Sequence, residues 1–203
     1  MKFSHALLPG SYDPVTLGHL SLLKRASLFC NKISACVFVN PKKTCLFSIE
    51  QRRDFLALAC KEIPGATAHY HTGWEPEFTQ AHNCDVIIKG IRNQTDLDYE
   101  YNIVQDWAKA NGVDYLLFVG DVNERGELIV QKEYPIKGAA TAQFCPAKHV
   151  PPMLLLPCEE RLAHVSSTAV RYALQNGADL SQLLVPSTAD AIVTAFKQMQ
   201  KNA

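Results

Sequence analysis

The sequence predicts an α/β protein with a five-stranded parallel sheet, helices on both faces, and a β-hairpin insertion near residues 113–150. Strand-like and helix-like patterns alternate from the N-terminus, which is typical of βα units that build a parallel sheet. Residues 33–39 form a continuous β-rich run, as expected of a strand that is covered on both faces. A chain of 203 residues fits a single domain over 1–203, with the insertion at about 113–152.

The composition excludes several classes of protein. Hydrophobic residues make up 47% of the chain, too many for a disordered protein. Lys+Arg and Asp+Glu number 20 each, which argues against a nucleic-acid binder, because that function needs a basic excess. No apolar run is long enough to cross a bilayer, and no signal peptide is recognisable, so no membrane partner is expected. The seven cysteines are far apart and form no CxxC pair, which predicts reduced, mostly buried thiols and a cytoplasmic protein.

The first strand and helix flank a turn that contains glycine and proline. Residues 6–8 are apolar and predict the end of a buried strand, and residues 20–29 have a helical pattern. Such a turn can hold phosphate, because backbone N–H groups and the helix dipole attract an anion. We expect Gly10 to let the backbone approach the anion closely and His19 to place an imidazole beside it.

The middle of the chain continues the same alternation. A capping box at Ser48 and Gln51 predicts a helix that runs to about Glu62. Apolar residues at helical spacing predict another helix over residues 95–111. The other elements expected here are strands at 33–39, 66–70 and 86–88 and a short helix at 75–83.

The alternation of predicted strands and helices is interrupted after residue 113. Residues 115–119 and 128–130 are both strand-like, and the turn residues 123–126 between them predict a β-hairpin. We expect a loop at 137–152, a buried strand at 153–156, a helix from Ser166 to about Asn176 that Gly177 ends, and an amphipathic helix around 192–199.

Polar clusters follow three of the predicted strands. They occupy residues 11–19, 41–43 and 89–92, after the first, second and fourth strands. In an open parallel sheet, ligands bind beyond the carboxyl ends of the strands. The three clusters therefore predict one anion-binding site at a common edge of the sheet.

Four motifs resemble those of a known family. Residues 10–19, GSYDPVTLGH, resemble the T/HxGH signature of the nucleotidyltransferase superfamily and are most similar to the phosphopantetheine adenylyltransferases. Residues 40–44 resemble the family pattern NPxKK, residues 89–100 resemble RGLR…DFEYE, and residues 165–171 resemble I-S-S-S/T-x-V-R. The resemblance covers about residues 3–110 and 153–200 and implies a Rossmann-like fold; the segment 113–152 has no counterpart in it.

The resemblance implies a reaction of coenzyme A biosynthesis, in which ATP and 4′-phosphopantetheine give dephospho-coenzyme A and pyrophosphate. It assigns His19 to the α-phosphate and places Ser11 and Lys43 on the acceptor phosphate, all three being catalytic, with Lys42 as a competing candidate for Lys43. Glu75 and Lys89 are expected on the acceptor side. The residues implied for ATP are Ser11, Tyr12, His19, Gly90, Ile91, Arg92, Glu100, Leu162, Ala163, His164, Val165, Ser166, Ser167 and Thr168.

Further implications concern the metal, the assembly and departures from the motifs. Mg²⁺ is expected on the phosphates of ATP, with no residue assigned as a metal ligand, and a homo-oligomer, a hexamer, is implied. Lys89 stands where the family has Arg, and Thr44 replaces a second Lys. Arg171 is expected to be structural and paired with a carboxylate.

Other functions remain open from the residues alone. One is a related nucleotidyltransferase of the nicotinamide mononucleotide or cytidylyl type, which usually has His in place of Thr16. Another is a non-catalytic nucleotide-binding protein whose insertion serves as a partner surface. His69 and His71 alternate on a predicted strand, but no third metal ligand follows at a fitting spacing.

Overall fold

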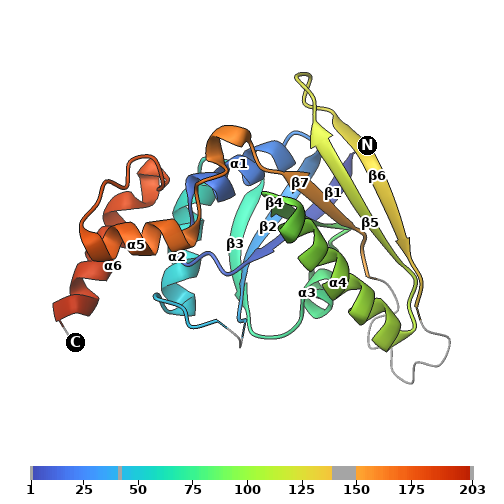
Figure 1. The fold of residues 1–203 in the computed structure, drawn as a ribbon, viewed down its shortest axis with the longest axis horizontal. Helices are drawn as coiled ribbons and strands as arrows, with labels where there is room; N and C mark the ends of the chain where they lie inside the picture. Colours follow the sequence, from blue (N-terminus) through green and yellow to red (C-terminus); the bar gives the residue numbers. More distant parts are fainter. Residues whose placement is uncertain (1, 41–42, 139–149, 202–203) are drawn as a thin grey trace.

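A computed structural model describes residues 2–40, 43–138 and 150–201. Within these residues the chain forms one seven-stranded sheet with the order β3-β2-β1-β4-β7-β5-β6 (Figure 1). The strands are β1 (Phe3–Gly10), β2 (Cys30–Phe38), β3 (Ala66–His71), β4 (Val86–Ile91), β5 (Tyr115–Val122), β6 (Leu128–Ile136) and β7 (Met153–Pro157). The helices are α1 (Leu17–Ala26), α2 (Ile49–Cys60), α3 (Glu75–His82), α4 (Gln94–Asn111), α5 (Ser167–Asn176) and α6 (Pro186–Lys201), with a 3₁₀ helix, η1, at Glu160–Leu162.

The predicted α/β class is confirmed, but the strand count was too low. The predicted five strands are β1, β2, β3, β4 and β7, and they pair in parallel. The predicted hairpin also exists, as β5 and β6, and it extends the same sheet. Leu117, Phe118 and Val119 of β5 pair in parallel with Met153, Leu154 and Leu155 of β7, so the insertion supplies two further strands.

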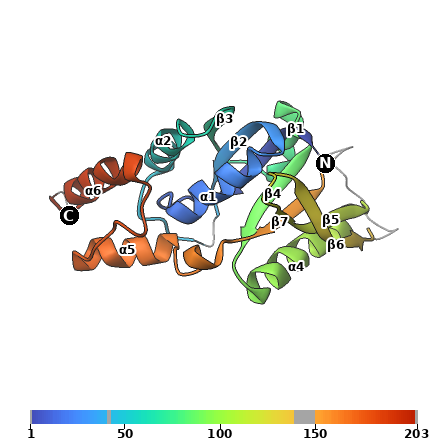
Figure 2. The same ribbon diagram turned by 90° about the horizontal axis from the view of Figure 1, so that it is seen from above.

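Helices cover both faces of the sheet, as predicted. The apolar residues of α1, α2, α5 and α6 belong to one core, and those of α3 and α4 belong to another. Along β1, Ala6 and Leu8 contribute to the first core and Leu7 to the second, because successive side chains of a strand point to opposite faces. Figures 1 and 2 both show α5 and α6 at the opposite end of the molecule from β5 and β6.

The helix ends agree with the capping signals, with one shift. Ser48 caps α2 with its predicted capping box, and α5 starts after Ser166 and ends at Gly177, where φ is +63°. The first helix begins three residues earlier than predicted and ends before Phe29. The reason is that Thr16 forms its N-cap, with a capping box to His19.

The remaining expectations concern cysteines, membranes and the loop. Six described cysteines are free; four are buried, and burial raises the pKa of Cys30 and Cys36 to about 12. No helix among the described residues has the length and apolarity needed to span a membrane. Residues 137–138 and 150–152 are neither helix nor strand, and the rest of the predicted loop lies outside the described residues.

Candidate active site

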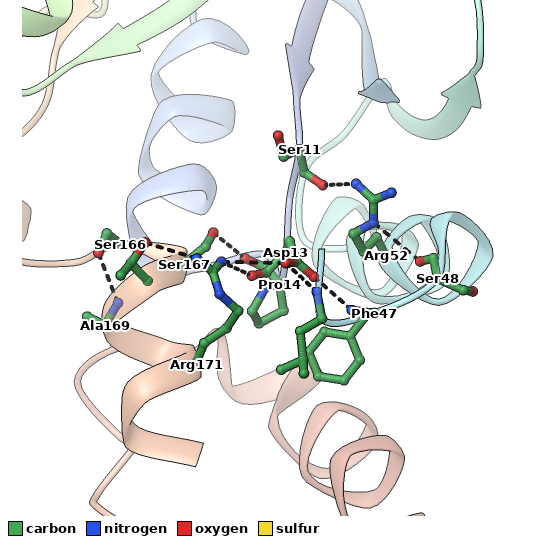
Figure 3. A network of polar contacts seen from close by, with 12 residues as sticks. Ser11, Asp13, Pro14, Phe47, Ser48, Arg52, Ser166, Ser167, Ala169 and Arg171 are labelled. Atoms are coloured by element: carbon green, nitrogen blue, oxygen red, sulfur yellow. Dashed lines mark hydrogen bonds and ion pairs between the residues drawn. The ribbon is translucent and has the colours of Figure 1, made fainter. Parts of the chain in front are cut away.

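The loop that follows β1 is held from one side by α2 and the segment before it (Figure 3). Arg52 of α2 donates a hydrogen bond of 2.8 Å from Nη1 to the carbonyl oxygen of Ser11. The carboxylate of Asp13, which is 3% exposed, accepts hydrogen bonds from the backbone N–H groups of Leu46 at 2.8 Å and Phe47 at 3.0 Å. These contacts fix the loop relative to the segment that follows Lys43.

The same loop is held from the other side by α5 (Figure 3). Ser167 Oγ donates to the carbonyl oxygen of Pro14 at 2.8 Å, and Arg171 Nη1 donates to the carbonyl oxygen of Asp13 at 2.7 Å. Arg171 Nη1 also lies 3.5 Å from Asp13 Oδ2, which is the structural pairing with a carboxylate that the sequence predicted. Two distant segments are therefore brought to the loop that carries the motif.

Gly10 and Tyr12 together shape the start of the loop. Tyr12 has a φ of 46°, is buried, and donates from its hydroxyl to the carbonyl oxygen of Leu8 at 2.9 Å. A Cβ atom on Gly10 would lie 2.8 Å from the Tyr12 ring, so a glycine is needed there to admit this side chain. The Tyr12 ring then packs against His19, with 4.8 Å between the ring centroids. The lack of a side chain at Gly10 thus leaves room for the Tyr12 ring.

The imidazole of His19 is oriented by its own helix cap. Its Nδ1 accepts a hydrogen bond from the backbone N–H of Thr16 at 3.1 Å and lies 2.9 Å from Thr16 Oγ1. Because Nδ1 is an acceptor, the proton of the neutral ring resides on Nε2. Burial, together with a smaller effect of the positive charge of Arg92, lowers the pKa of His19 to about 4. At neutral pH, His19 is therefore an uncharged hydrogen-bond donor.

The predicted loops meet around a cavity of about 600 Å³. Its lining comes from the loop after β1, the start of α1, the segment after β2, the end of β4, α4, and the start of α5. The predicted site residues that line it are Ser11, Tyr12, His19, Lys43, Lys89, Gly90, Arg92, Glu100, Leu162, Val165, Ser166, Ser167 and Thr168. Lys42 and Pro41 lie outside the described residues.

Three of the residues expected at the nucleotide do not line this cavity. They are Ile91, Ala163 and His164. Ile91 is 7% exposed and belongs to the core beneath α4, because its side chain points to the opposite face of the sheet from the neighbouring Gly90. Its backbone carbonyl accepts a hydrogen bond from the N–H of Cys158 at 2.7 Å.

A second cavity of about 530 Å³ adjoins the first. The two cavities share Pro9, Ser11, Lys43, Lys89, Tyr99 and Glu100. Glu75, which was predicted on the acceptor side, lines only the second cavity. Most of its other lining residues are apolar, among them Phe38, Val39, Trp74, Ile103, Trp107 and Met153. Two lysines thus stand at the border between a polar cavity and a largely apolar one.

Lys89 is held between two carboxylates at this border. Its Nζ lies 3.0 Å from Glu75 Oε1 and 3.1 Å from Glu100 Oε2, and its side chain is 15% exposed. Burial acts to lower the pKa of Lys89, but the charges and hydrogen bonds of Glu75 and Glu100 outweigh this effect and raise it. The lysine is therefore protonated, and the two carboxylates hold its ammonium group in place.

Arg92 and the first residues of α5 line the first cavity but not the second. Arg92 forms two side-chain hydrogen bonds with Asp96, Nε to Oδ2 at 2.9 Å and Nη2 to Oδ1 at 3.1 Å. Ser166 caps α5 by accepting from the N–H of Ala169 at 3.1 Å. The first N–H groups of a helix have no intrahelical acceptor and can bind an anion.

Sequence reasoning missed the contribution of α1 to the cavity wall. Ser21, Leu22 and Arg25 line the first cavity together with Gly18. These positions recur every three or four residues, so they share one face of a helix. That spacing, counted from Gly18 in the motif, was the signal that could have found them.

The pair of histidines on β3 has local partners. His69 Nε2 lies 2.9 Å from Thr67 Oγ1, and His71 Nε2 lies 3.6 Å from Glu77 Oε2. Among the described residues there is no group of three or more His, Cys, Asp or Glu side chains that could hold a metal ion.

Comparisons with known proteins show the family of the chain. Residues 7–173 match the cytidylyltransferase-like family. A phosphopantetheine adenylyltransferase of Caldanaerobacter subterraneus subsp. tengcongensis is 34% identical over 143 residues, which are 70% of this chain and 89% of the relative. Another, from Thermotoga neapolitana, is 28% identical over 193 residues, or 95% of this chain and 97% of the relative.

A solved structure shares the fold. It is Plasmodium falciparum nicotinic acid mononucleotide adenylyltransferase complexed with NaAD, which aligns over 96% of each chain with a TM-score of 0.57 and 14% sequence identity. At that identity the likeness concerns the fold alone. The family match over residues 7–173 and the relative of 34% identity lead to one assignment: the chain belongs to the cytidylyltransferase-like family and, within it, to the phosphopantetheine adenylyltransferases.

Proposed function

We propose that this chain transfers the adenylyl group of ATP to 4′-phosphopantetheine, giving dephospho-coenzyme A and pyrophosphate. The observation that carries the proposal is the junction of two cavities at Ser11, Lys43 and Lys89. A reaction that joins two phosphate groups needs two binding spaces that meet at cationic and hydroxyl groups. The names of the relatives identify the pair of substrates that fits this arrangement.

In this proposal the polar cavity takes ATP and the largely apolar cavity takes the pantetheine arm. Ser11 and Lys43, which line both cavities, hold the acceptor phosphate, and Lys89 assists them. The apolar side chains of the second cavity suit the uncharged part of the arm. Glu75 would contact that arm and also hold Lys89.

The chemical step is an in-line displacement. An oxygen of the acceptor phosphate attacks the α-phosphorus of ATP, and the bond to the bridging oxygen of pyrophosphate breaks with its electron pair. A phosphate whose second pKa is about 6 is largely ionised at neutral pH, so the step needs no general base. Catalysis then depends on positioning and on stabilising charge on the oxygens of the transferred group.

His19 would stabilise that charge. Its Nε2–H can donate to an α-phosphate oxygen, while Thr16 keeps the ring in the required tautomer. A neutral donor that is already oriented needs no reorganisation as charge develops. Arg92 and the start of α5, which line only the first cavity, would take the leaving pyrophosphate.

We propose that Mg²⁺ enters with ATP and is held by the phosphate oxygens. The carboxylates in the cavity wall do not fit a metal centre, because Asp13 accepts backbone N–H groups, Asp96 pairs with Arg92, and Glu100 pairs with Lys89. The ion would neutralise part of the charge of the phosphates, and no residue of the chain is assigned to it.

A substrate panel tests the proposed function. Purified protein with Mg²⁺ is given ATP and 4′-phosphopantetheine, ATP and nicotinamide mononucleotide, or CTP and a cytidylyl acceptor. Pyrophosphate release is measured in each mixture. We expect release only with 4′-phosphopantetheine. Release with another acceptor points to a related nucleotidyltransferase, and ATP binding by calorimetry without any turnover points to a non-catalytic protein.

The assembly and location of the chain are also proposals. We propose a homo-oligomer, with six copies as the family resemblance implies, in the cytoplasm. Sedimentation equilibrium of the full chain tests the assembly.

A further inference from the structure

The β5–β6 hairpin is tied to the wall of the nucleotide cavity through Arg25. Arg25, in the last turn of α1, donates from Nη1 to the carbonyl oxygen of Pro157 at 2.5 Å and pairs through Nη2 with the carboxylate of Asp121. Its side chain is 15% exposed, and it lines the first cavity but not the second. One guanidinium thus joins α1, the end of β7 and the hairpin.

A β-bulge accounts for the direction of the Asp121 side chain. The pairing of β5 with β6 shifts register between Val119 and Gly120, and such a bulge redirects the side chains that follow it. A Cβ on Gly120 would lie 2.8 Å from the carbonyl oxygen of Ile129, so the bulge needs glycine. The Asp121 carboxylate also accepts a hydrogen bond from the N–H of Val122 at 2.7 Å, which orients it further.

Arg25 bridges the place where β5 stops pairing with β7. The last residues in that pairing are Val119 and Leu155, so Pro157 lies beyond it. Its carbonyl is followed at once by Cys158, which lines the cavity. Ser21 Oγ donates to Glu159 Oε1, so α1 holds the segment after β7 at a second point.

We propose that Asp121 is a positioning residue for nucleotide binding, which acts by holding Arg25 against Pro157. Without Asp121, the guanidinium loses one of its two anchors and the carboxylate that orients it. The hold of Arg25 on Pro157 is then weakened, and the contact of Ser21 with Glu159 alone ties the segment after β7 to α1. The hairpin is in this way part of the nucleotide site, an assignment that rests on the proposed function because it takes the first cavity as the ATP site.

We expect Asp121 to affect ATP affinity strongly and the stability of the fold only weakly. The Asp121 side chain is 48% exposed, and an ion pair with an exposed partner contributes little to folding. A change in ATP affinity with little change in melting temperature therefore separates positioning from a general structural role.

Isothermal titration calorimetry with Mg²⁺ and ATP, without acceptor, tests the proposal on the full chain. Asp121→Asn should raise the Kd for ATP by about tenfold, the loss expected for one hydrogen bond to a charged group. Asp121→Glu should recover most of the affinity. Glu133→Gln on the exposed face of β6 is the matched control and should bind ATP as the wild type does. The Kd for 4′-phosphopantetheine should not change in any of these variants, because Arg25 does not line the second cavity.

A second variant keeps the test decisive. Lysine cannot span two acceptors as the guanidinium does, so Arg25→Lys should weaken ATP binding by itself. If Asp121 acts through Arg25, the double variant should bind ATP no more weakly than Arg25→Lys alone. Additive losses, or wild-type affinity in Asp121→Asn, overturn the proposal. If Asp121→Asn does not fold, wild-type affinity in Arg25→Lys overturns it instead.

Measuring ATP binding apart from turnover also distinguishes a failure of this proposal from a failure of the proposed function. A wild-type protein that binds ATP but does not adenylylate 4′-phosphopantetheine contradicts the proposed function and leaves the Asp121 measurements valid. A wild-type protein that does not bind ATP contradicts both.

Discussion

Arg171 of α5 donates a hydrogen bond to the carbonyl oxygen of Asp13, a residue 158 positions earlier in the chain. The same guanidinium lies 3.5 Å from the Asp13 carboxylate, which also accepts the N–H groups of Leu46 and Phe47. One buried acid thus joins the loop after β1 to the segment before α2 and to α5. The site depends on this junction, because each of these three segments contributes to the first cavity.

Asp13→Ala should therefore destabilise the protein strongly. The substitution leaves two buried N–H groups without their acceptor and Arg171 without its carboxylate, at a cost of about 3–5 kcal/mol. Urea unfolding followed by circular dichroism measures the change. Asp54→Ala is the control, since Asp54 pairs with Arg53 on the surface and its side chain is 63% exposed. Equal losses in the two variants would contradict the role of Asp13.

His19→Ala should lower kcat by about 10²–10³-fold and change the KM for ATP far less, because the donated hydrogen bond strengthens only in the transition state. Steady-state kinetics with 4′-phosphopantetheine measure both constants. The control is His82→Ala, an exposed histidine of α3 that lines neither cavity. A kcat within a few-fold of the wild-type value would show that His19 is not a catalytic residue.

The lowered pKa of His19 also predicts how stability depends on pH. The ring is neutral in the folded protein down to about pH 4 but protonates near 6.5 when unfolded. The contribution of the neutral His19 ring to the free energy of unfolding is therefore complete above pH 6.5. It is lost as the pH falls from 6.5 toward 4. Between pH 7 and pH 5, the wild type should lose up to about 2 kcal/mol more stability than His19→Asn. Urea unfolding at both pH values tests this, and parallel losses would show that the pKa is not lowered.

The two lysines after β2 should differ sharply. Lys43 lines both cavities, so Lys43→Ala removes a charge at the point where the two phosphates would meet. We expect kcat/KM to fall by about tenfold or more, the loss of one charge-assisted hydrogen bond. Lys42→Ala is the neighbouring control and should change kcat/KM little. Equal effects would undo the assignment of Lys43 over Lys42.

Lys89→Met should raise the KM for 4′-phosphopantetheine more than the KM for ATP. The substitution removes the cation that lies between Glu75 and Glu100 at the border of the cavities. The two carboxylates would then repel the phosphate of the acceptor. Lys89→Arg restores the charge and should retain activity. Lys109→Met, on the exposed end of α4, is the control. A larger effect on ATP than on the acceptor would place Lys89 on the nucleotide side.

Local patterns in the sequence were sufficient for most of the elements. Apolar runs located all five central strands, and the hydroxyl caps Ser48 and Ser166 located two helix starts, because capping and periodicity involve residues only a few positions apart. The meeting of the loops at one edge also followed from the sequence, since parallel strands present their carboxyl ends together. Thr16 was missed as a helix cap because its partner, His19, was interpreted only as a site residue.

The tertiary structure decided what depends on partners distant in the chain. That β5 joins the central sheet beside β7 is a matter of strand order, and no local pattern encodes which edge a hairpin takes. The contacts of Arg25 with Asp121, of Asp13 with Arg171, and of Lys89 with Glu75 arise only once that order and the helix positions are set. The sequence by itself predicted which residues would carry the chemistry, and it determined at which end of the sheet they lie. Only the folded chain decided how each charge is held, because hydrogen bonds and ion pairs act over a few ångströms, whatever the separation along the chain.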